Sequence, residues 1–478
     1  MRRILCAVAV LAGLAACAPM TSQRSDSRVE PPPVIQPLEQ VTIARPSAPK
    51  RAGTDPSSEL QNVGVEQLAL SHVAPLSAPL DLWDRMRRGF AMPDLDTELV
   101  RDRERWYTAR PETITRLTER SRKYLFHIVE ELERRNMPTE LALLPFVESA
   151  FNPNAVSSAK AAGMWQFIPS TGKNFDLKQN AFRDDRRDVL ASTRAALDYL
   201  QKLYGMFGDW QLALAAYNWG EGNVGKALAK QQKAGGSTAY ADLPMPMETR
   251  FYVPKLQALK NIVANPHSFS VKLPDIGNHP FFDTVTVNRD IDVTLAAKLA
   301  EVQLEDFKLL NPSLNRPIIM AAATPQILLP WDNAQLFVRH LDAYGGNTAS
   351  WMVWIAPSTM KAADAAKRVG MSEAELRSIN NIPNRMMVGA GSMLVVPRPA
   401  HVVNDVVATV ADAGQVSLSP EIIPKRAVPG KGRRAAIAKG KVKANTASAG
   451  KPDGQRSPKK TNVVTQTSKP NPGLVAKR

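Results

Sequence analysis

One glutamate of this sequence stands where its side chain could act as an acid. Glu148 follows a nearly uniform apolar run over residues 141–147. A carboxyl group held among apolar neighbours loses solvation, which favours its protonated form and suits it to donate a proton. A sugar oxygen leaves poorly until it is protonated, so cleavage of a glycosidic bond requires a donor of this kind. A lone glutamate could equally cap a helix or pair with an arginine, and Glu148 by itself leaves both interpretations open.

Three motifs rich in polar and aromatic residues follow Glu148-Ser149 along the chain: residues 163–167 (Gly-Met-Trp-Gln-Phe), 216–220 (Ala-Tyr-Asn-Trp-Gly) and 248–253 (Glu-Thr-Arg-Phe-Tyr-Val). Gly163 has no side chain, which would let the backbone approach a sugar closely, and Gln166 offers an acceptor and two donors. Flat apolar faces against which pyranose C–H groups can pack are supplied by Trp165, Tyr217, Trp219 and Tyr252. The two tryptophans could equally be core residues. Arg250 is expected to pair with a carboxylate.

Together the four motifs resemble those of the family-1, goose-lysozyme-like lytic murein transglycosylases, over about residues 115–260. The resemblance implies an enzyme that cleaves the β-1,4 bond between N-acetylmuramic acid and N-acetylglucosamine in peptidoglycan, without a cofactor. It implies that Glu148 is the catalytic residue, that Ser149 forms a hydrogen bond near it, and that Tyr252 assists beside it. It further implies that the substrate is bound by Met164, Gln166, Tyr217 and Asn218.

The resemblance also implies that one acid does the work of two. Glu148 would protonate the leaving oxygen and, once ionised, take the proton of the C6 hydroxyl, which closes a 1,6-anhydromuramic end. Ordinary glycosidases need a second carboxylate. Asp184, Asp185 and Asp188 could supply one, although their positions favour loop and helix-cap roles. The alternatives are therefore a hydrolytic, lysozyme-like muramidase and a non-catalytic wall-binding lipoprotein.

Helices are predicted to position these motifs. From residue 63 to 267 apolar residues recur at three- and four-residue steps, most clearly over 112–136 and 188–204. The first of these helices should end near Asn136, and the second at Gly205 and Gly208. No strand-like alternation interrupts the region, so the sequence predicts an all-α, lysozyme-like catalytic domain.

Two short segments of similar design follow, at residues 282–332 and 350–399. Each reads as a strand, two helices and a closing strand, and the order repeats after about 67 residues. Both resemble LysM modules, which bind glycans that contain N-acetylglucosamine. Both depart from that family in one respect, because neither has the Gly-Asp-Thr usual after the first strand. With these modules the chain resembles the membrane-bound lytic murein transglycosylase D group, and the predicted fold class is mainly α with two small β-α-α-β modules.

The N-terminus has the pattern of a lipoprotein signal peptide. A positive start and an apolar stretch over residues 4–16, too short to span a bilayer, precede Leu14-Ala15-Ala16-Cys17, which resembles a lipobox. This pattern predicts cleavage before Cys17, lipidation of its thiol and, with Ala18 next, attachment to the periplasmic face of the outer membrane. An ordinary signal peptide with an incidental cysteine is the alternative. The proline-rich residues 18–62 are predicted to be a disordered tether.

The positive charge of the chain gathers at its C-terminal end. Residues 421–478 hold 15 Lys and Arg against 2 Asp and Glu, a net +13, so the other 420 residues carry +3 of the total +16. We therefore predict a disordered basic tail over 401–478 and no nucleic-acid partner. The six histidines lack metal-ligand spacing, and no metal site is predicted. The predicted partners are peptidoglycan glycan strands and, through the lipid anchor, a membrane; the sequence does not determine the oligomeric state.

Overall fold

The computed structural model describes residues 81–421, which lie within one compact unit that begins at Ser77. The predicted signal peptide with Cys17, the tether over 18–62 and the tail beyond residue 421 lie outside the described residues. Within 81–421, no helix combines the length and the apolar character that crossing a membrane requires.

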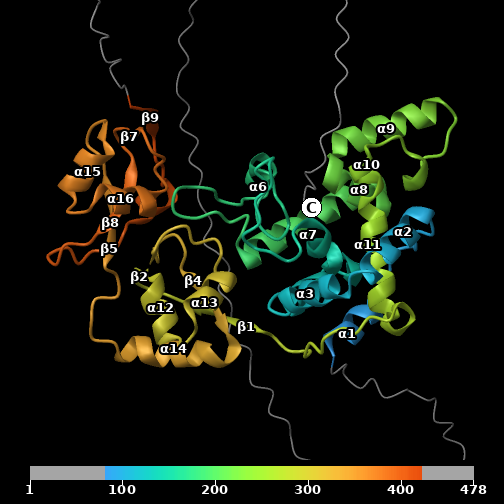
Figure 1. Cartoon of the computed structure of the whole chain (residues 1–478), viewed down its shortest axis with the longest axis horizontal. Coiled ribbons are helices and arrows are strands. Elements are labelled where there is room, and N and C mark those ends of the chain that lie inside the picture. The colour runs from blue at the N-terminus through green and yellow to red at the C-terminus, as the bar shows by residue number, and fades with distance from the viewer. Residues whose placement is uncertain (1–80, 422–478) are drawn as a thin grey trace, which may run out of the picture. The chain divides into compact units, whose positions relative to one another are not determined.

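The first part of the described chain is helical, as predicted, and it is coloured blue to green in Figure 1. Its core is one cluster of buried apolar side chains that reaches from Leu82 to Ile276 and includes Leu310 and Leu328 of the next region. From residue 81 to residue 281 the structure has isolated bridges but no named strand. The α-helices are α1 (Leu82–Arg88), α2 (Glu98–Thr108), α3 (Pro111–Ser121), α4 (Leu125–Arg134), α5 (Leu144–Glu148), α6 (Pro169–Asn174), α7 (Val189–Phe207), α8 (Trp210–Trp219), α9 (Glu221–Lys233), α10 (Met247–Arg250) and α11 (Tyr252–Ala264), with short 3-10 turns at Thr139–Leu143, Tyr240–Asp242 and Pro266–Phe269.

The helix predicted over 112–136 is in fact two helices, α3 and α4. The chain leaves helical geometry at Tyr124, whose ring is buried and stacks on Phe151 at 6.4 Å between centroids. Its hydroxyl donates to the carbonyl oxygen of Leu309 at 2.8 Å. A contact so distant in sequence leaves no mark on the local apolar period, which explains why the sequence predicted one helix. The other prediction was closer: α7 continues through Gly205 and ends at Gly208, which takes the left-handed conformation (φ 67°).

Both modules have the predicted order of elements. In the first, β1 (Phe282–Thr286) pairs antiparallel with β4 (Gln326–Pro330) around α12 (Val293–Leu299) and α13 (Leu304–Leu310). In the second, β5 (Trp351–Ile355) pairs with β8 (Met393–Pro397) around α15 (Ala362–Arg368) and α16 (Glu373–Asn380). Each module also has a short second pair: β2 (Ile291–Asp292) with β3 (Ile318–Ile319), and β6 (Met360–Lys361) with β7 (Met386–Val388). The insertion between the modules is α14 (Trp331–Ala343).

A buried asparagine makes the same hydrogen bonds in each module. The amide of Asn311 donates to Phe307 and Leu328 carbonyls and accepts from the Leu328 backbone N–H. Asn380 forms the equivalent bonds to Leu376 and Val395. In both cases the side chain ties the end of the second helix to the closing strand, and it satisfies backbone groups that have lost contact with water. The repeat noticed in the sequence is therefore a repeat of hydrogen bonding as well as of element order.

Residues 401–421 differ from the prediction of disorder from residue 401 onward. They contain α17 (Ala408–Asp412) and β9 (Leu418–Pro420), and β9 pairs antiparallel with β7. Ala411 is fully buried. The segment has too few large apolar residues to build a core of its own, but it adds a strand and a small helix to cores that already exist.

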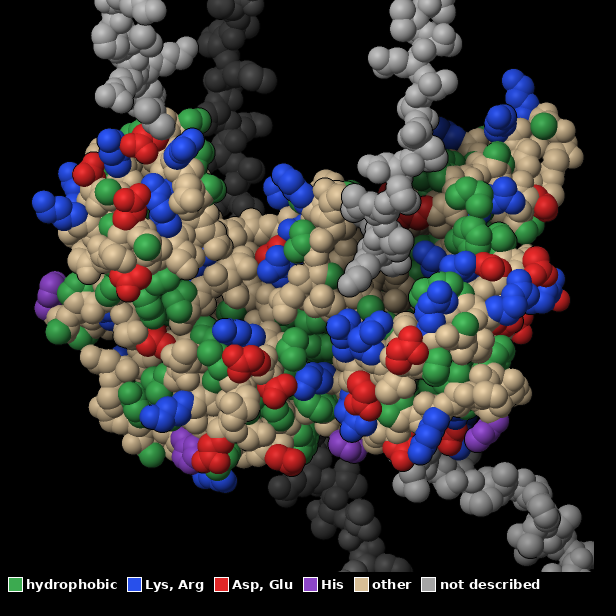
Figure 2. All heavy atoms as spheres, in the orientation of Figure 1, with side chains coloured by type: hydrophobic (Ala, Val, Ile, Leu, Met, Phe, Trp, Pro, Cys, Tyr) green, Lys and Arg blue, Asp and Glu red, His purple; other side chains and the backbone are tan. Residues whose placement is uncertain are grey.

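Charges of both signs are interspersed on the face shown in Figure 2. Lys and Arg side chains alternate there with Asp and Glu side chains instead of forming one basic patch. This distribution agrees with the small net charge calculated for the sequence before its last 58 residues.

Candidate active site

Glu148 is the last residue of α5, a helix of only five residues. The apolar residues before it are buried, and the side chains of residues 147–150 are half-buried. The Glu148 side chain therefore lies where the helical core meets the surface, and it is half-buried, unlike the enclosed apolar residues before it. The hydroxyl of Tyr252, the first residue of α11, donates a hydrogen bond to Oε1 of Glu148.

Two phenols lie close to Glu148: that of Tyr252, which is buried, and that of Tyr217, which is half-buried. Burial raises the pKa of Tyr252 and that of Tyr217 well above the ordinary value of 10, and the nearby Glu148 carboxylate raises both pKa values further. Both hydroxyls therefore stay protonated and can donate at any physiological pH. The hydroxyl of Tyr217 donates a hydrogen bond to the carbonyl oxygen of Trp165 at 2.8 Å.

The second motif lies in a folded loop, residues 155–168, which we call the substrate loop because it includes Gln166, which the resemblance implies binds substrate. The N–H of Gly163 donates to the carbonyl of Ala155 at 3.0 Å, and Gln166 adopts a left-handed backbone (φ 51°) with its amide donating to the Gly163 carbonyl at 2.8 Å. Ser149 Oγ donates to the carbonyl of Met164 at 2.9 Å. Through this bond the end of α5 holds the substrate loop beside Glu148.

Three residues of this loop have surroundings different from those expected. Trp165 is fully buried and its Nε1 donates to Thr193 Oγ1 at 3.1 Å, so it is a core residue and offers no face to a sugar. The side chain of Met164 is also fully buried, so it presents no surface to a subsite. Gly163 (φ 84°) lacks a side chain for another reason: a Cβ there would lie 1.9 Å from the carbonyl oxygen of Arg186. The close approach that this glycine allows is to the protein's own backbone.

The third and fourth motifs are joined by a hydrogen bond that the sequence did not predict. Thr249, which is buried, donates through Oγ1 to Asn218 Oδ1 at 2.8 Å. Tyr240 holds the same region, because its hydroxyl donates to the Thr249 carbonyl at 2.6 Å and accepts from the Val253 N–H at 3.3 Å. Trp219 at the end of α8 is only half-buried.

The sequence also did not predict a hydrogen-bonded pair, Tyr199 and Glu221, that lies next to Tyr217. The ring of Tyr199 lies 5.4 Å from that of Tyr217, and its hydroxyl donates to Glu221 Oε2 at 2.8 Å. The position of Glu221, directly after the third motif, was the one feature of the sequence that could have indicated this pair. Arg250, by contrast, was expected to pair with a carboxylate, but it is exposed and forms no ion pair within residues 81–421.

The three aspartates considered as a second catalytic group all have local partners. Asp188 caps α7 by accepting from the N–H groups of Leu190 and Ala191. Asp184 forms an ion pair with Arg186 at 2.7 Å. Asp185 accepts from the Lys178 N–H at 3.1 Å, and burial raises its pKa to about 6. In the described part of the chain, no group of three or more His, Cys, Asp or Glu side chains could hold a metal ion.

Two known families match this chain. The family described as Transglycosylase SLT domain matches residues 127–239, which include Glu148, the substrate loop and Tyr217. The family described as Lytic transglycosylase MltD, LysM-like domain matches residues 281–345, the first module together with α14.

Three known proteins are similar to parts of this chain. Membrane-bound lytic murein transglycosylase D of Escherichia coli (strain K12) is 35% identical over 332 residues, which are 65% of this chain and 73% of the relative. A putative tributyltin chloride resistance protein of Alteromonas sp. (strain M-1) is 47% identical over 111 residues, 23% of this chain and 54% of that protein. A putative soluble lytic murein transglycosylase of Haemophilus influenzae is 32% identical over 155 residues, 30% of this chain and 23% of that protein.

Proposed function

This chain belongs to the lytic murein transglycosylases and acts on peptidoglycan, and from that premise we propose that Glu148 is its catalytic acid and base. The observation that supports the assignment is the hydrogen bond from Tyr252 to Glu148 at the end of a buried helix. The phenol fixes the direction of the carboxyl group. The buried apolar residues of α5 precede it, and its own side chain is half-buried.

The reaction uses Glu148 twice. Protonated Glu148 gives its proton to the oxygen between N-acetylmuramic acid and N-acetylglucosamine, the C1–O bond breaks, and its electron pair leaves with that oxygen. The acetamido group of the muramic sugar stabilises the positive C1. Ionised Glu148 then takes the proton of the C6 hydroxyl as O6 bonds to C1, so the 1,6-anhydro ring closes and no water is consumed.

Substrate binding is assigned to the remaining motif residues in their observed surroundings. Gln166 and Asn218 offer amide groups to hydroxyl and acetamido groups of the sugars. Tyr217 supports the substrate loop through the Trp165 carbonyl. Met164, whose side chain is fully buried, helps to hold the loop through its backbone carbonyl, which accepts a hydrogen bond from Ser149 Oγ.

The place of action is proposed from the N-terminal sequence. The E. coli relative is named as membrane-bound, and we assign membrane attachment here to a lipid on Cys17 at the periplasmic face of the outer membrane. In this proposal the two modules (282–332 and 350–399) hold the anchored enzyme against glycan strands.

Glu148→Gln tests the assignment of the acid, because an amide keeps the shape of the side chain but cannot give up a proton. We expect digestion of purified sacculi by the form lacking residues 1–17 to fall about 10²- to 10⁴-fold, the usual contribution of general acid–base catalysis. Product masses, which are one water lower for anhydro ends than for hydrolysed ends, identify the reaction. Glu112→Gln, on the exposed start of α3, is the matched control and should digest normally. If Glu148→Gln released anhydro products at the normal rate, another residue would be the acid.

A further inference from the structure

Residues 177–188 join α6 to α7 and contact both the substrate loop and the modules; we call this segment the arm. It is a tight hairpin, held by the N–H of Asp185 donating to the Lys178 carbonyl at 2.8 Å and by Asn180 Oδ1 accepting from the N–H groups of Phe182 and Arg183. These local bonds define the shape of the segment. None of the reaction steps above uses the arm.

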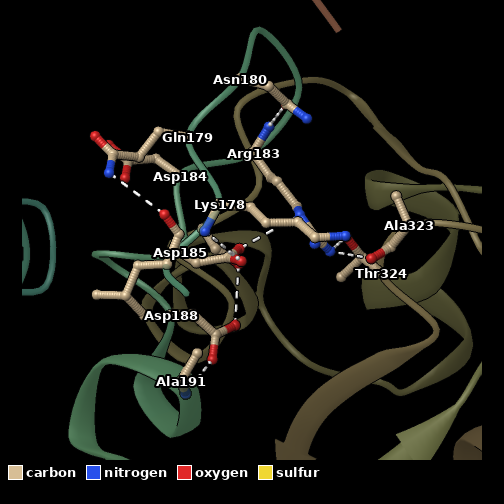
Figure 3. Close-up of polar contacts among 12 residues, drawn as sticks. Lys178, Gln179, Asn180, Arg183, Asp184, Asp185, Asp188, Ala191, Ala323 and Thr324 are labelled. Atoms are coloured by element: carbon tan, nitrogen blue, oxygen red, sulfur yellow. Dashed lines mark hydrogen bonds and ion pairs between the residues drawn. The ribbon is translucent and has the colours of Figure 1, made fainter. Parts of the chain in front are cut away.

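The first module binds the outer part of the arm through backbone hydrogen bonds. The Asp184 N–H donates to the Ser313 carbonyl at 3.0 Å, and the Asn315 N–H donates to the Phe182 carbonyl at 2.9 Å. Figure 3 shows Arg183 extending from the arm to Ala323, whose carbonyl accepts from the guanidinium, and to Thr324 Oγ1 at 3.5 Å. These bonds bridge residues more than 120 positions apart in the sequence.

The segment that follows the second module holds the arm from another direction. The Ala181 N–H donates to the Gly414 carbonyl at 2.9 Å, and Asn180 Nδ2 donates to the Ala411 carbonyl at 3.1 Å. Lys178 forms an ion pair with Asp412 at 2.7 Å. This ion pair is exposed and contributes little, so the backbone bonds carry this contact.

Phe182, at the tip of the arm, fills a small apolar cluster that no single domain could build. Its side chain is 6% exposed. Its buried neighbours come from the first module, the connection between modules, the second module and α17: Ile318, Met320, Ala349, Val395 and Ala411. Gly414 lies so close that a Cβ there would stand 2.4 Å from the Phe182 ring.

The inner part of the arm supports the substrate loop. Arg186 donates from one guanidinium nitrogen to the carbonyls of Lys160 (2.7 Å) and Phe167 (3.2 Å), the two ends of the stretch that includes Gly163 and Gln166. Asp184 directs this guanidinium through a second nitrogen at 2.7 Å. The Arg186 carbonyl fills the space left by the missing side chain of Gly163.

We infer that Arg186 is a positioning residue for the substrate loop, and that the arm makes its position depend on how both modules are seated. Asp184 carries the link, since its backbone binds the first module while its carboxylate orients Arg186. A module displaced by its load on the wall would shift Phe182 and Asp184 together, and thereby loosen the loop that holds Gln166. The inference rests on the proposed function for the identity of the substrate loop.

Gly414→Val in the chain lacking residues 1–17 tests the link from a point remote from the catalytic motifs. The added side chain should expel Phe182 from its cluster. Hydrogen–deuterium exchange should then rise several-fold in peptides that cover residues 155–168 as well as in those that cover 177–188. Gly345→Val is the matched control, because a Cβ at Gly345 meets nothing within 4 Å, and exchange should stay unchanged there. Faster exchange of the arm with unchanged exchange of 155–168 would overturn the inference, whatever the activity of the variant.

Arg186→Lys tests the positioning role on the reaction itself. Lysine keeps the charge but loses the planar fork that reaches two carbonyls and a carboxylate at once. Since Arg186 holds the loop and not the acid, we expect KM for soluble glycan strands to rise about tenfold, with a smaller fall in kcat. Equal kcat and KM to the parent, or a fall confined to kcat, would contradict the assignment. Because exchange and KM do not depend on which group is the acid, this failure is distinct from failure of the Glu148→Gln test.

Discussion

At the scale of single residues, burial decides what each titratable group can do. The phenol of Tyr252 remains a donor because its surroundings disfavour its charged form. Two other groups, which lie outside the candidate site, have pKa values shifted from their ordinary values. Burial lowers the pKa of His127 to about 4, and its Nε2 has no hydrogen-bond partner. Burial raises the pKa of Asp185 to about 6.

These two groups predict opposite dependences of stability on pH. Between pH 6.5 and 4 the unfolded chain binds a proton at His127 that the folded chain does not, so acidification destabilises the fold. Asp185 keeps a proton in the fold up to about pH 6 that the unfolded chain loses near 3.8, so its contribution is present at low pH and is lost as pH rises. From pH 7 to 5, we expect about 2 kcal/mol lost through His127 and about 1 kcal/mol gained through Asp185.

Urea unfolding at pH 5 and pH 7 measures both terms. Asp185→Asn should lose more stability on acidification than the parent chain, and His127→Gln should lose less. If both variants moved in the same direction, the assigned burial of one of the two groups would be wrong.

At the scale of elements, short pieces are held in place by distant partners. A helix of five residues such as α5 is not stable by itself, so Glu148 depends on the core around it and on Tyr252 of α11. The substrate loop depends on Ser149 on one side and on the arm on the other. Within this arrangement Gly163 is the position most sensitive to substitution, because any side chain there would clash with the Arg186 carbonyl.

Gly163→Ala should therefore be strongly destabilising. It adds a left-handed backbone cost of about 1–2 kcal/mol to a direct clash with the Arg186 carbonyl. The melting temperature and the rate of sacculus digestion should both fall. Gly205→Ala provides the contrast: it lies inside α7 with open space around it and should raise stability by about 0.5–1 kcal/mol without changing activity. Normal melting and digestion by Gly163→Ala would refute the tight packing of loop against arm.

At the scale of the whole molecule, the cysteine proposed as the anchor, the catalytic domain and the two modules lie on different segments of one chain. The family match at residues 281–345 identifies the first module as a LysM-like domain. The second module has the same order of strands and helices and a buried asparagine with the same hydrogen bonds. The arm belongs to the catalytic domain and contacts both modules, so none of the three is isolated from the others.

The proposed anchor depends on one of two cysteines. Cys17→Ser, expressed as the full chain, should move the enzyme from the membrane fraction to the soluble periplasmic fraction, because it removes the thiol that would carry the lipid. Cys6→Ser is the matched control, and the protein should stay with the membrane. Equal membrane retention of both variants would exclude Cys17 as the anchor.

The sequence by itself determined what depends on neighbours along the chain. Apolar periods predicted the helical domain, and the order of strands and helices predicted both modules. Four spaced motifs predicted the family, since residue types at fixed spacing are visible without a fold. Its account of individual environments was less complete, because the residue type of Trp165 or Gly163 does not reveal what lies across from it.

Only the tertiary structure decided which residues meet. It divides the helix at Tyr124, buries Trp165 against Thr193, and brings the hydroxyl of Tyr252 to Glu148 across more than 100 residues. It also orders residues 401–421 on cores that other segments supply. The physical reason is common to all of these cases: burial and hydrogen bonding are satisfied by whatever group lies nearest in space, and a linear pattern records only the need for a partner.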